Sequence, residues 1–139
     1  MRTLLLAGSV LLGGCLFSSD DDRLNIGVQF EIVDPDPAAE PRVIRGPNIV
    51  QVDHRFQTTT ECANFTASAR QNVSVIEVTI GVESVSNSTC PTGTTEWRYS
   101  ALITGYKGVV SRVGITRTGG LNPGRVEYAI PDEVSTGQD

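Results

Sequence analysis

The chain has 139 residues, with 16 acidic and 11 basic side chains and a formal net charge of −5. An acidic balance without a basic cluster argues against binding to nucleic acid and against a polybasic contact with a membrane surface. The length is sufficient for one domain with its own hydrophobic core.

The first residues have the features of an export signal. Arg2 supplies a positive charge, and residues 3–14 are apolar or small throughout. This segment is shorter than the ~20 residues that a membrane-spanning helix needs. It fits the ~7–15 apolar residues of a secretory signal peptide. We therefore expect residues 1–14 to be removed on export.

The signal segment ends in the motif Leu12-Gly13-Gly14-Cys15. This motif resembles the lipobox of bacterial lipoproteins, and the resemblance implies that Cys15 carries lipid and anchors the mature chain in a membrane. In such lipoproteins Asp after the cysteine favours retention in the inner membrane. Leu16 therefore points to the outer membrane if the host has two membranes. The alternative is an ordinary cleaved signal with an unmodified Cys15.

Residues 15–23 are expected to form a polar tether. Ser18 and Ser19 are followed by three adjacent aspartates, residues 20–22, which repel one another and stay solvated. A calcium site is the alternative, but Ca²⁺ takes about six to eight oxygen ligands from a shaped loop. The solvated tether is the simpler interpretation.

Two cysteines remain once Cys15 is assigned to lipid. Cys62 and Cys90 of an exported chain meet an oxidising compartment, where such a pair usually forms a disulfide. Two free thiols are one alternative. A metal pair is another, but His54 is the only histidine and the spacing matches no zinc pattern. We expect the disulfide, and no metal or cofactor.

Apolar and polar residues alternate along the first third of the mature chain. Residues 24–32 and 50–56 show the period of two that indicates a half-buried strand. Residues 42–45 are predicted to form a short strand between them. The Pro-rich segment 34–37 ends the first strand, because proline has no N–H to donate to a sheet.

The middle of the chain predicts two more strands. Residues 62–69 place small and aromatic side chains on one face, and residues 71–72 are the expected turn. A long β-branched strand follows at 73–85, with a bulge or bend near 75–76 where the apolar phase changes. Residues 86–94 are rich in Ser, Asn, Thr, Pro and Gly and predict a surface loop pinned by Cys90.

The last third predicts three strands. Residues 96–106 and 109–117 alternate in phase, and residues 107–108 have the right length for a tight hairpin turn between them. Residues 119–124 are a loop rich in turn residues. Residues 126–130 complete the set as a final strand.

The mature chain shows no helical period, so we predict an all-β fold. Seven or eight short strands in about a hundred residues favour an antiparallel β-sandwich, with a small barrel as the alternative. The spacing resembles immunoglobulin-like or fibronectin type III-like domains. Trp97 follows both cysteines instead of lying between them, so the true immunoglobulin signature is absent. The predicted domain spans 24–131, and 132–139 form a flexible tail.

Three groups of side chains are candidate sites. His54 is in phase with apolar neighbours and no nucleophile motif accompanies it, so a partly buried structural histidine is favoured and no catalytic site is expected. The acidic loop 34–40 could offer oxygens to calcium, but it lacks a calcium-binding pattern. Trp97 and Tyr99 could form a sugar- or peptide-stacking face; their shared phase with Ala101 favours core packing instead.

The sequence therefore predicts an exported, membrane-anchored module whose partner is another protein of the cell envelope. Loops or an edge strand would provide the contact. The alternatives are a binder of a small ligand or metal, and a purely structural role. Catalysis is not expected, because no activated nucleophile or metal cluster is evident.

Overall fold

The computed structural model describes residues 22–85, 87 and 89–132. Within these ranges the chain forms β-strands and no helix. The predicted signal segment, residues 15–21 of the predicted tether with the lipid site at Cys15 and Leu16, and residues 133–139 of the tail lie outside the described residues. The strands are β1 (Arg23–Ile32), β2 (Arg42–Gly46), β3 (Ile49–Thr60), β4 (Ala63–Asn72), β5 (Val75–Ser84), β6 (Thr92–Thr104), β7 (Arg112–Thr118) and β8 (Gly124–Ala129).

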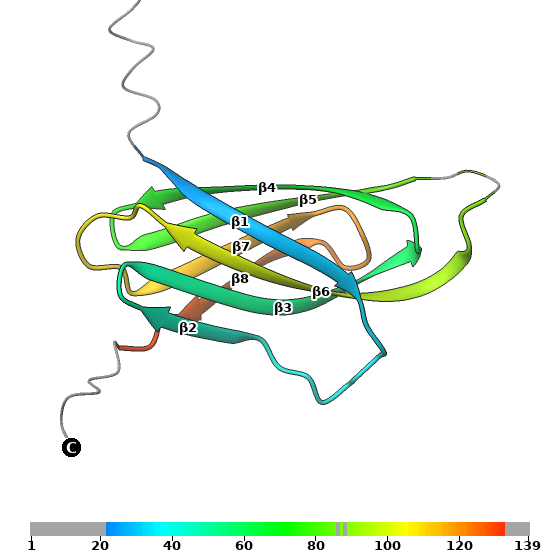
Figure 1. The fold of residues 1–139 in the computed structure, drawn as a ribbon, viewed down its shortest axis with the longest axis horizontal. Helices are drawn as coiled ribbons and strands as arrows, with labels where there is room; N and C mark the ends of the chain where they lie inside the picture. The colour runs from blue at the N-terminus through cyan, green and yellow to red at the C-terminus, as the bar shows by residue number, and fades with distance from the viewer. Residues whose placement is uncertain (1–21, 86, 88, 133–139) are drawn as a thin grey trace, which may run out of the picture.

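The eight strands form one sheet in the order β2-β3-β6-β1-β4-β5-β7-β8. The sheet folds over at β1, whose first residues pair with β4 and whose later residues pair with β6. Strands β2, β3, β6 and β1 therefore face strands β4, β5, β7 and β8 (Figure 1). The sheet is nearly closed: the rings of His54 on β3 and Tyr128 on β8 lie 5.8 Å apart. The prediction of an all-β fold is confirmed.

The core lies between the two halves of the folded sheet. Along β3, Val50 and Val52 are fully buried, while Gln51 between them and Asp53 after them are not, as the period of two predicts. Tyr99 on β6 is the largest fully buried side chain. Each buried aliphatic or aromatic side chain contributes about 1.5–3 kcal/mol relative to an exposed one. Trp97 is also buried, so the core interpretation of Trp97 and Tyr99 is confirmed.

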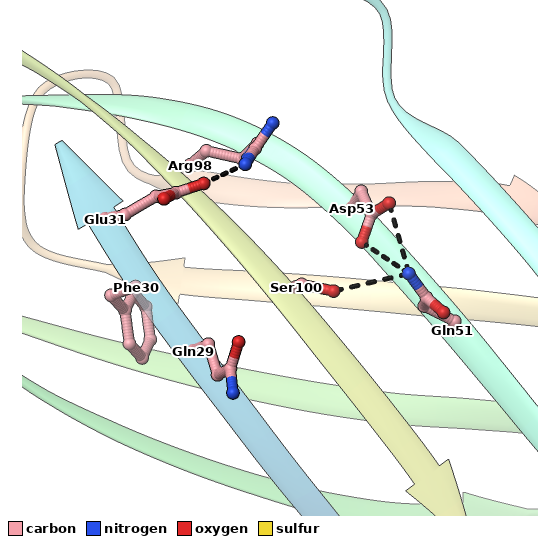
Figure 2. A pocket seen from close by; sticks show the side chains of 7 residues that line it. All are labelled: Gln29, Phe30, Glu31, Gln51, Asp53, Arg98 and Ser100. Atoms are coloured by element: carbon pink, nitrogen blue, oxygen red, sulfur yellow. Dashed lines mark hydrogen bonds and ion pairs between the residues drawn. The ribbon is translucent and has the colours of Figure 1, made fainter. Parts of the chain in front are cut away.

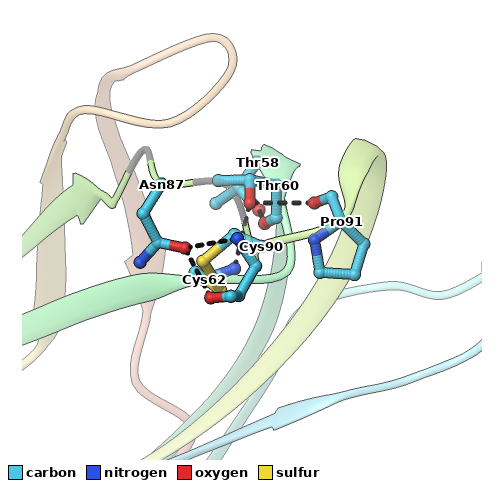
Figure 3. Close-up of a disulfide and its surroundings, with 7 residues drawn as sticks. Thr58, Thr60, Cys62, Asn87, Cys90 and Pro91 are labelled. Carbon is cyan, nitrogen blue, oxygen red and sulfur yellow. Dashed lines mark hydrogen bonds between the residues drawn. A yellow bond between two sulfur atoms is a disulfide. The ribbon is translucent and has the colours of Figure 1, made fainter.

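A disulfide closes one end of the domain (Figure 3). The sulfur atoms of Cys62, at the start of β4, and Cys90, in the β5–β6 loop, lie 2.11 Å apart, as predicted. Thr60 supports both sides: its hydroxyl donates to the carbonyl of Pro91 at 3.0 Å and accepts from the N–H of Cys62 at 3.1 Å. The loop of 28 residues that the bond closes corresponds to about 3–4 kcal/mol in the chain-entropy account.

The turn predicted at residues 71–72 lies two residues later. Asn72 still pairs with Val75, so Val73 and Ser74 form a two-residue β4–β5 turn. Val73 has φ 56°, in the left-handed region that a β-branched residue rarely adopts. The predicted bulge near 75–76 is wrong, because pairing between β4 and β5 runs without a register shift. Val73 is out of phase because it belongs to the turn.

The hairpin predicted at residues 107–108 is also wrong. β7 does not pair with β6 but lies parallel to β5 in the other half of the sheet. Residues 105–111 form a crossover loop in which Gly105 and Gly108 have positive φ and Val110 is buried. Burial of the apolar face of β7 against the opposite layer overrides the local turn signal. The expectation of a purely antiparallel arrangement is corrected accordingly.

Candidate functional site

The outward face of β1, β6 and β3 carries polar side chains in cross-strand rows. Successive side chains of a strand point to opposite faces, so Gln29 and Glu31 face outward while Phe30 packs against the core. The register places Gln29 opposite Ser100, and Ser100 opposite Asp53. Residues far apart in the sequence thus form one polar row across three strands.

A groove of about 720 Å³ runs over these rows. Figure 2 shows the side chains of its lining carried on the three neighbouring strands. We call it the polar groove, and it is lined by Gln29, Phe30, Glu31, Gln51, Asp53, Arg98 and Ser100.

Hydrogen bonds already connect part of the polar groove. The amide nitrogen of Gln51 donates to both carboxylate oxygens of Asp53, at 3.1 and 3.3 Å, and to the hydroxyl of Ser100 at 3.4 Å. Arg98 forms an ion pair with Glu31. The side chain of Gln29 has no hydrogen bond to any other described residue. One amide of the polar groove is therefore unengaged within the part of the chain that the structure describes.

The polar groove offers both hydrogen-bond donors and acceptors. Amides provide both functions, carboxylates accept, and the guanidinium of Arg98 donates. Arg98 and Glu31 are each about half exposed, 49% and 55%, and such a surface pair stabilises the fold by at most about 1 kcal/mol. A polar partner can therefore replace this pair at little cost. The mixture of signs suits a peptide or another neutral polar molecule better than a highly charged one.

A second hollow, the seam pocket, lies where β3 and β6 approach β7, β8 and the loop between them. It has a volume of about 240 Å³, and His54, Tyr99, Arg117 and Asn122 are among its lining residues. The guanidinium of Arg117 donates to the carbonyls of Gly119 at 2.9 Å and Asn122 at 2.7 Å. Its Cζ also lies 5.2 Å from the centre of the Phe56 ring. These contacts hold a cation at the wall of the pocket.

Burial shifts the pKa values of two side chains that line the seam pocket, His54 and Tyr99. Desolvation, followed by the positive charge of Arg117, lowers the pKa of His54. Desolvation raises the pKa of Tyr99, whose buried hydroxyl has no hydrogen-bond partner in the described part of the chain. Both side chains are therefore neutral near pH 7. An unpaired buried hydroxyl is unfavourable, and native structures contain few of them.

The structure separates the other residues considered as candidate ligands. His54 points inward while Asp53, its chain neighbour, lines the polar groove on the opposite face. The carboxylate of Asp36 accepts the backbone N–H of Ala38 at 3.0 Å within its own loop. Among the described residues there is no group of three or more His, Cys, Asp or Glu side chains that could hold a metal.

Sequence reasoning missed the polar groove. Gln29, Gln51, Arg98 and Ser100 occupy the polar positions of alternating strands, and such positions usually face solvent without further role. Only the order β3-β6-β1 and its register show that they share one surface. Their polar phase was the available signal, but their proximity requires the tertiary structure.

Comparison with models of protein families, with curated proteins and with solved structures found no match for this chain. In the part of the chain that the structure describes, no helix is long and apolar enough to span a bilayer. Function is therefore inferred from the polar groove, the seam pocket and the N-terminal sequence.

Proposed function

We propose that this chain is an exported lipoprotein that holds a small β-domain at a membrane and binds a protein partner of the cell envelope. Support for export comes from Arg2 and the apolar residues 3–14, and the resemblance of Leu12–Cys15 to a lipobox supports lipidation of Cys15. Leu16 favours the outer membrane in a host with two membranes. Two or more acyl chains would anchor the domain stably.

The fold and the disulfide are consistent with this location. The Cys62–Cys90 bond fits an oxidising compartment outside the cytosol. We interpret the folded sheet as an immunoglobulin-like sandwich, because two facing sets of strands enclose one core. The parallel β5–β7 pair departs from the purely antiparallel form of that interpretation.

The polar groove is the proposed contact surface, and it is the observation on which the assignment of a binding role depends. It covers three neighbouring strands and presents an amide at Gln29 without a partner among the described residues. Rigid strands hold its donors and acceptors in fixed positions, which lowers the entropy lost on binding. A polypeptide segment that supplies both amide and carbonyl groups fits this mixture.

Photo-cross-linking in living cells tests the proposal. Lys107 is the only lysine and lies outside the polar groove, so amine-reactive reagents would not report on it. Benzoylphenylalanine placed at Gln29 reports directly, and the same probe at exposed Thr79 on β5 is the matched control. We expect a discrete adduct from position 29, none from 79, and loss of the adduct in a Cys15→Ala background.

Two results would contradict this proposal in different ways. Equal adducts from positions 29 and 79 would mean that the polar groove is not the contact surface. A mature chain from membranes without a lipid mass on Cys15 would remove the anchor. Ser100→Arg, which fills the polar groove without touching the core, should abolish a genuine adduct.

The seam pocket favours a second candidate function, the binding of a small anionic ligand. A half-buried cation at Arg117 and the Tyr99 hydroxyl, which has no hydrogen-bond partner among the described residues, are the groups that would hold a carboxylate or phosphate. Citrate and inorganic phosphate are suitable probes. Binding would raise the melting temperature with concentration, and Arg117→Gln would remove that rise. No rise with either probe in the wild type would count against this function for those two anion classes.

A further inference from the structure

Strand β1 begins at the end of the domain that carries the β4–β5 turn and the β6–β7 loop (Figure 1). The carbonyl of Asp22, the first described residue, accepts a hydrogen bond of 2.8 Å from the N–H of Gln71. Val73, in the β4–β5 turn, lies two residues after Gln71. We call this region, comprising Asp22, the turn 73–74 and the loop 105–111, the tether end.

The side chain of Gln71 holds the turn and the loop together. Its amide nitrogen donates to the carbonyl of Val73 at 2.9 Å and to that of Lys107 at 2.6 Å. Its amide oxygen accepts from the N–H of Lys107 at 2.8 Å. The N–H of Ser111 donates to the carbonyl of Ser74 at 2.8 Å. The tether end is therefore one connected platform.

Two apolar side chains project from this platform. Val73 is 86% exposed and Val109 is 80% exposed, whereas the other large exposed hydrophobics of the described chain reach at most 49%. Val73 also occupies a left-handed position at φ 56°, where Asn or Gly would be less strained. The backbone strain of a β-branched residue there is the same in any medium, whereas the exposure of its side chain is unfavourable in water. Contact with an apolar medium would account for that exposure.

We propose that the tether end rests on the lipid bilayer, with Val73 and Val109 inserted at the boundary between headgroups and acyl chains. The inference depends on the proposed lipidation of Cys15. From Cys15 to Asp22 the chain can span at most about 25 Å, so an anchored Cys15 keeps this end close to the membrane. The apolar tips therefore lie within reach of the bilayer.

The exposed Lys107 completes the surface. It lies two residues before Val109 and is the only lysine of the chain. A lysine can lay its apolar stem along a membrane and keep its ammonium among phosphate headgroups. Two valines and one lysine bind a bilayer too weakly to act alone. They orient a domain that the lipid already holds.

This orientation deepens the proposed function. The polar groove extends from Gln51, which pairs with Leu102 about 10 Å from the loop 105–111, to Gln29, which lies six residues beyond Arg23 on β1 and so about 20 Å from the start of that strand. The disulfide lies at the opposite end, near the start of β6. The polar groove would then face sideways above the headgroups, and the disulfide end would point away from the membrane.

Fluorescence on the lipidated full-length mature protein tests the orientation. Val73→Cys, Val109→Cys and Thr94→Cys each supply one free thiol for an environment-sensitive nitrobenzoxadiazole label. Thr94 is an exposed control on β6, ten residues before its end at Thr104 and so about 33 Å from the tether end. The protein is reconstituted on vesicles of phosphatidylethanolamine and phosphatidylglycerol, after its intact mass has verified the lipid.

We expect labels at 73 and 109 to shift to shorter emission wavelength on vesicles and to become several-fold less sensitive to iodide quenching. The label at 94 should change little. Aqueous spectra at all three positions, with protein that carries lipid and floats with the vesicles, would overturn the orientation while leaving the anchor intact. A shift in native membranes but not in protein-free vesicles would also overturn it, because the tips would then contact a protein.

Failure of the anchor itself gives a different result. A mature chain without a lipid mass that does not float with vesicles would overturn the proposed anchoring, and the orientation with it. Mass and flotation thus report on the proposed function, whereas the position dependence of the label reports on the orientation.

Discussion

The two ends of the domain are closed by different means. At the disulfide end, the Cys62–Cys90 bond joins the start of β4 to the β5–β6 loop covalently, and the hydrogen bonds of Thr60 support it on both sides. At the tether end, the turn and the crossover loop have no covalent link, and hydrogen bonds of Gln71 hold the two tips together. The tether end also exposes Val73 and Val109, the two most accessible large apolar side chains of the described residues.

The two ends therefore differ in what they contribute: one stabilises the fold, and the other fixes the positions of exposed side chains. A covalent bond restricts the unfolded chain and stabilises whatever it closes. Exposed hydrogen bonds add little net free energy, but they fix the relative positions of two loop tips. The tether end is therefore built to present its surface rather than to stabilise the fold, and the disulfide end has the opposite emphasis.

The largest effect should come from breaking the disulfide end. Cys62→Ala with Cys90→Ala should lower the free energy of unfolding by roughly 3–4 kcal/mol, because the unfolded chain gains the freedom of the loop of 28 residues. Calorimetry with and without reductant would measure a fall in melting temperature of more than 10 °C for a domain of this size. Cys15→Ala is the control and should leave it unchanged. Equal melting temperatures for the reduced and oxidised protein would contradict this account.

A smaller effect is expected at the tether end. Gln71→Ala removes three hydrogen bonds, but water can replace most of them at an exposed site, so we expect a loss of about 1 kcal/mol. Amide hydrogen exchange should accelerate at Lys107, while amides beside Cys90 keep their rates. Gln57→Ala, which removes one part-buried amide hydrogen bond to Glu96, is the control. Faster exchange at both ends would show that the ends are not independent.

The sequence predicted the strands better than their connections. Alternation along residues 24–32 and 50–56 was sufficient, because half-buried strands impose a period of two on the side chains. The prediction of a hairpin turn at 107–108 was wrong, because a two-residue spacing cannot show that the next strand crosses to the other layer. The disulfide was predictable by elimination once Cys15 had been assigned to lipid.

The candidate sites were less predictable than the fold. Gln29, Ser100 and Asp53 are separated by tens of residues, and only the register of β1, β6 and β3 makes them neighbours. His54 was correctly expected to be partly buried, but its place beside Arg117 depends on how closely β3 approaches β7. The sequence did not reveal that residue 73 lies in a turn, because valine is β-branched and favours strands.

A substitution at Val73 should separate stability from membrane contact. Val73→Asn should raise the stability of the soluble domain by about 0.5–1 kcal/mol, because Asn adopts the left-handed conformation more readily than a β-branched residue. Chemical denaturation would measure the gain. In the lipidated protein the same substitution should weaken the insertion of the tether end into vesicles. A label at position 109 would then be quenched more strongly by iodide. Val109→Asn, read with a label at position 73, is the control and should weaken the contact without raising stability.

The smallest predicted effect is the contribution of His54, which lies between the two ends, to the pH dependence of stability. Burial and Arg117 lower its pKa in the folded protein, whereas the unfolded chain takes up the proton near the ordinary value of about 6.5. Below that pH the unfolded chain binds more protons, so stability falls as the pH drops until the folded protein also protonates. His54→Phe keeps ring contacts to Tyr99 and Tyr128 but cannot titrate. Melting temperatures from about pH 7.5 to 5.5, above the range of most carboxylates, should therefore fall more for the wild type than for the variant. Parallel profiles would mean that His54 gains its proton as easily in the folded protein as in the unfolded chain, and that the seam pocket is open to water.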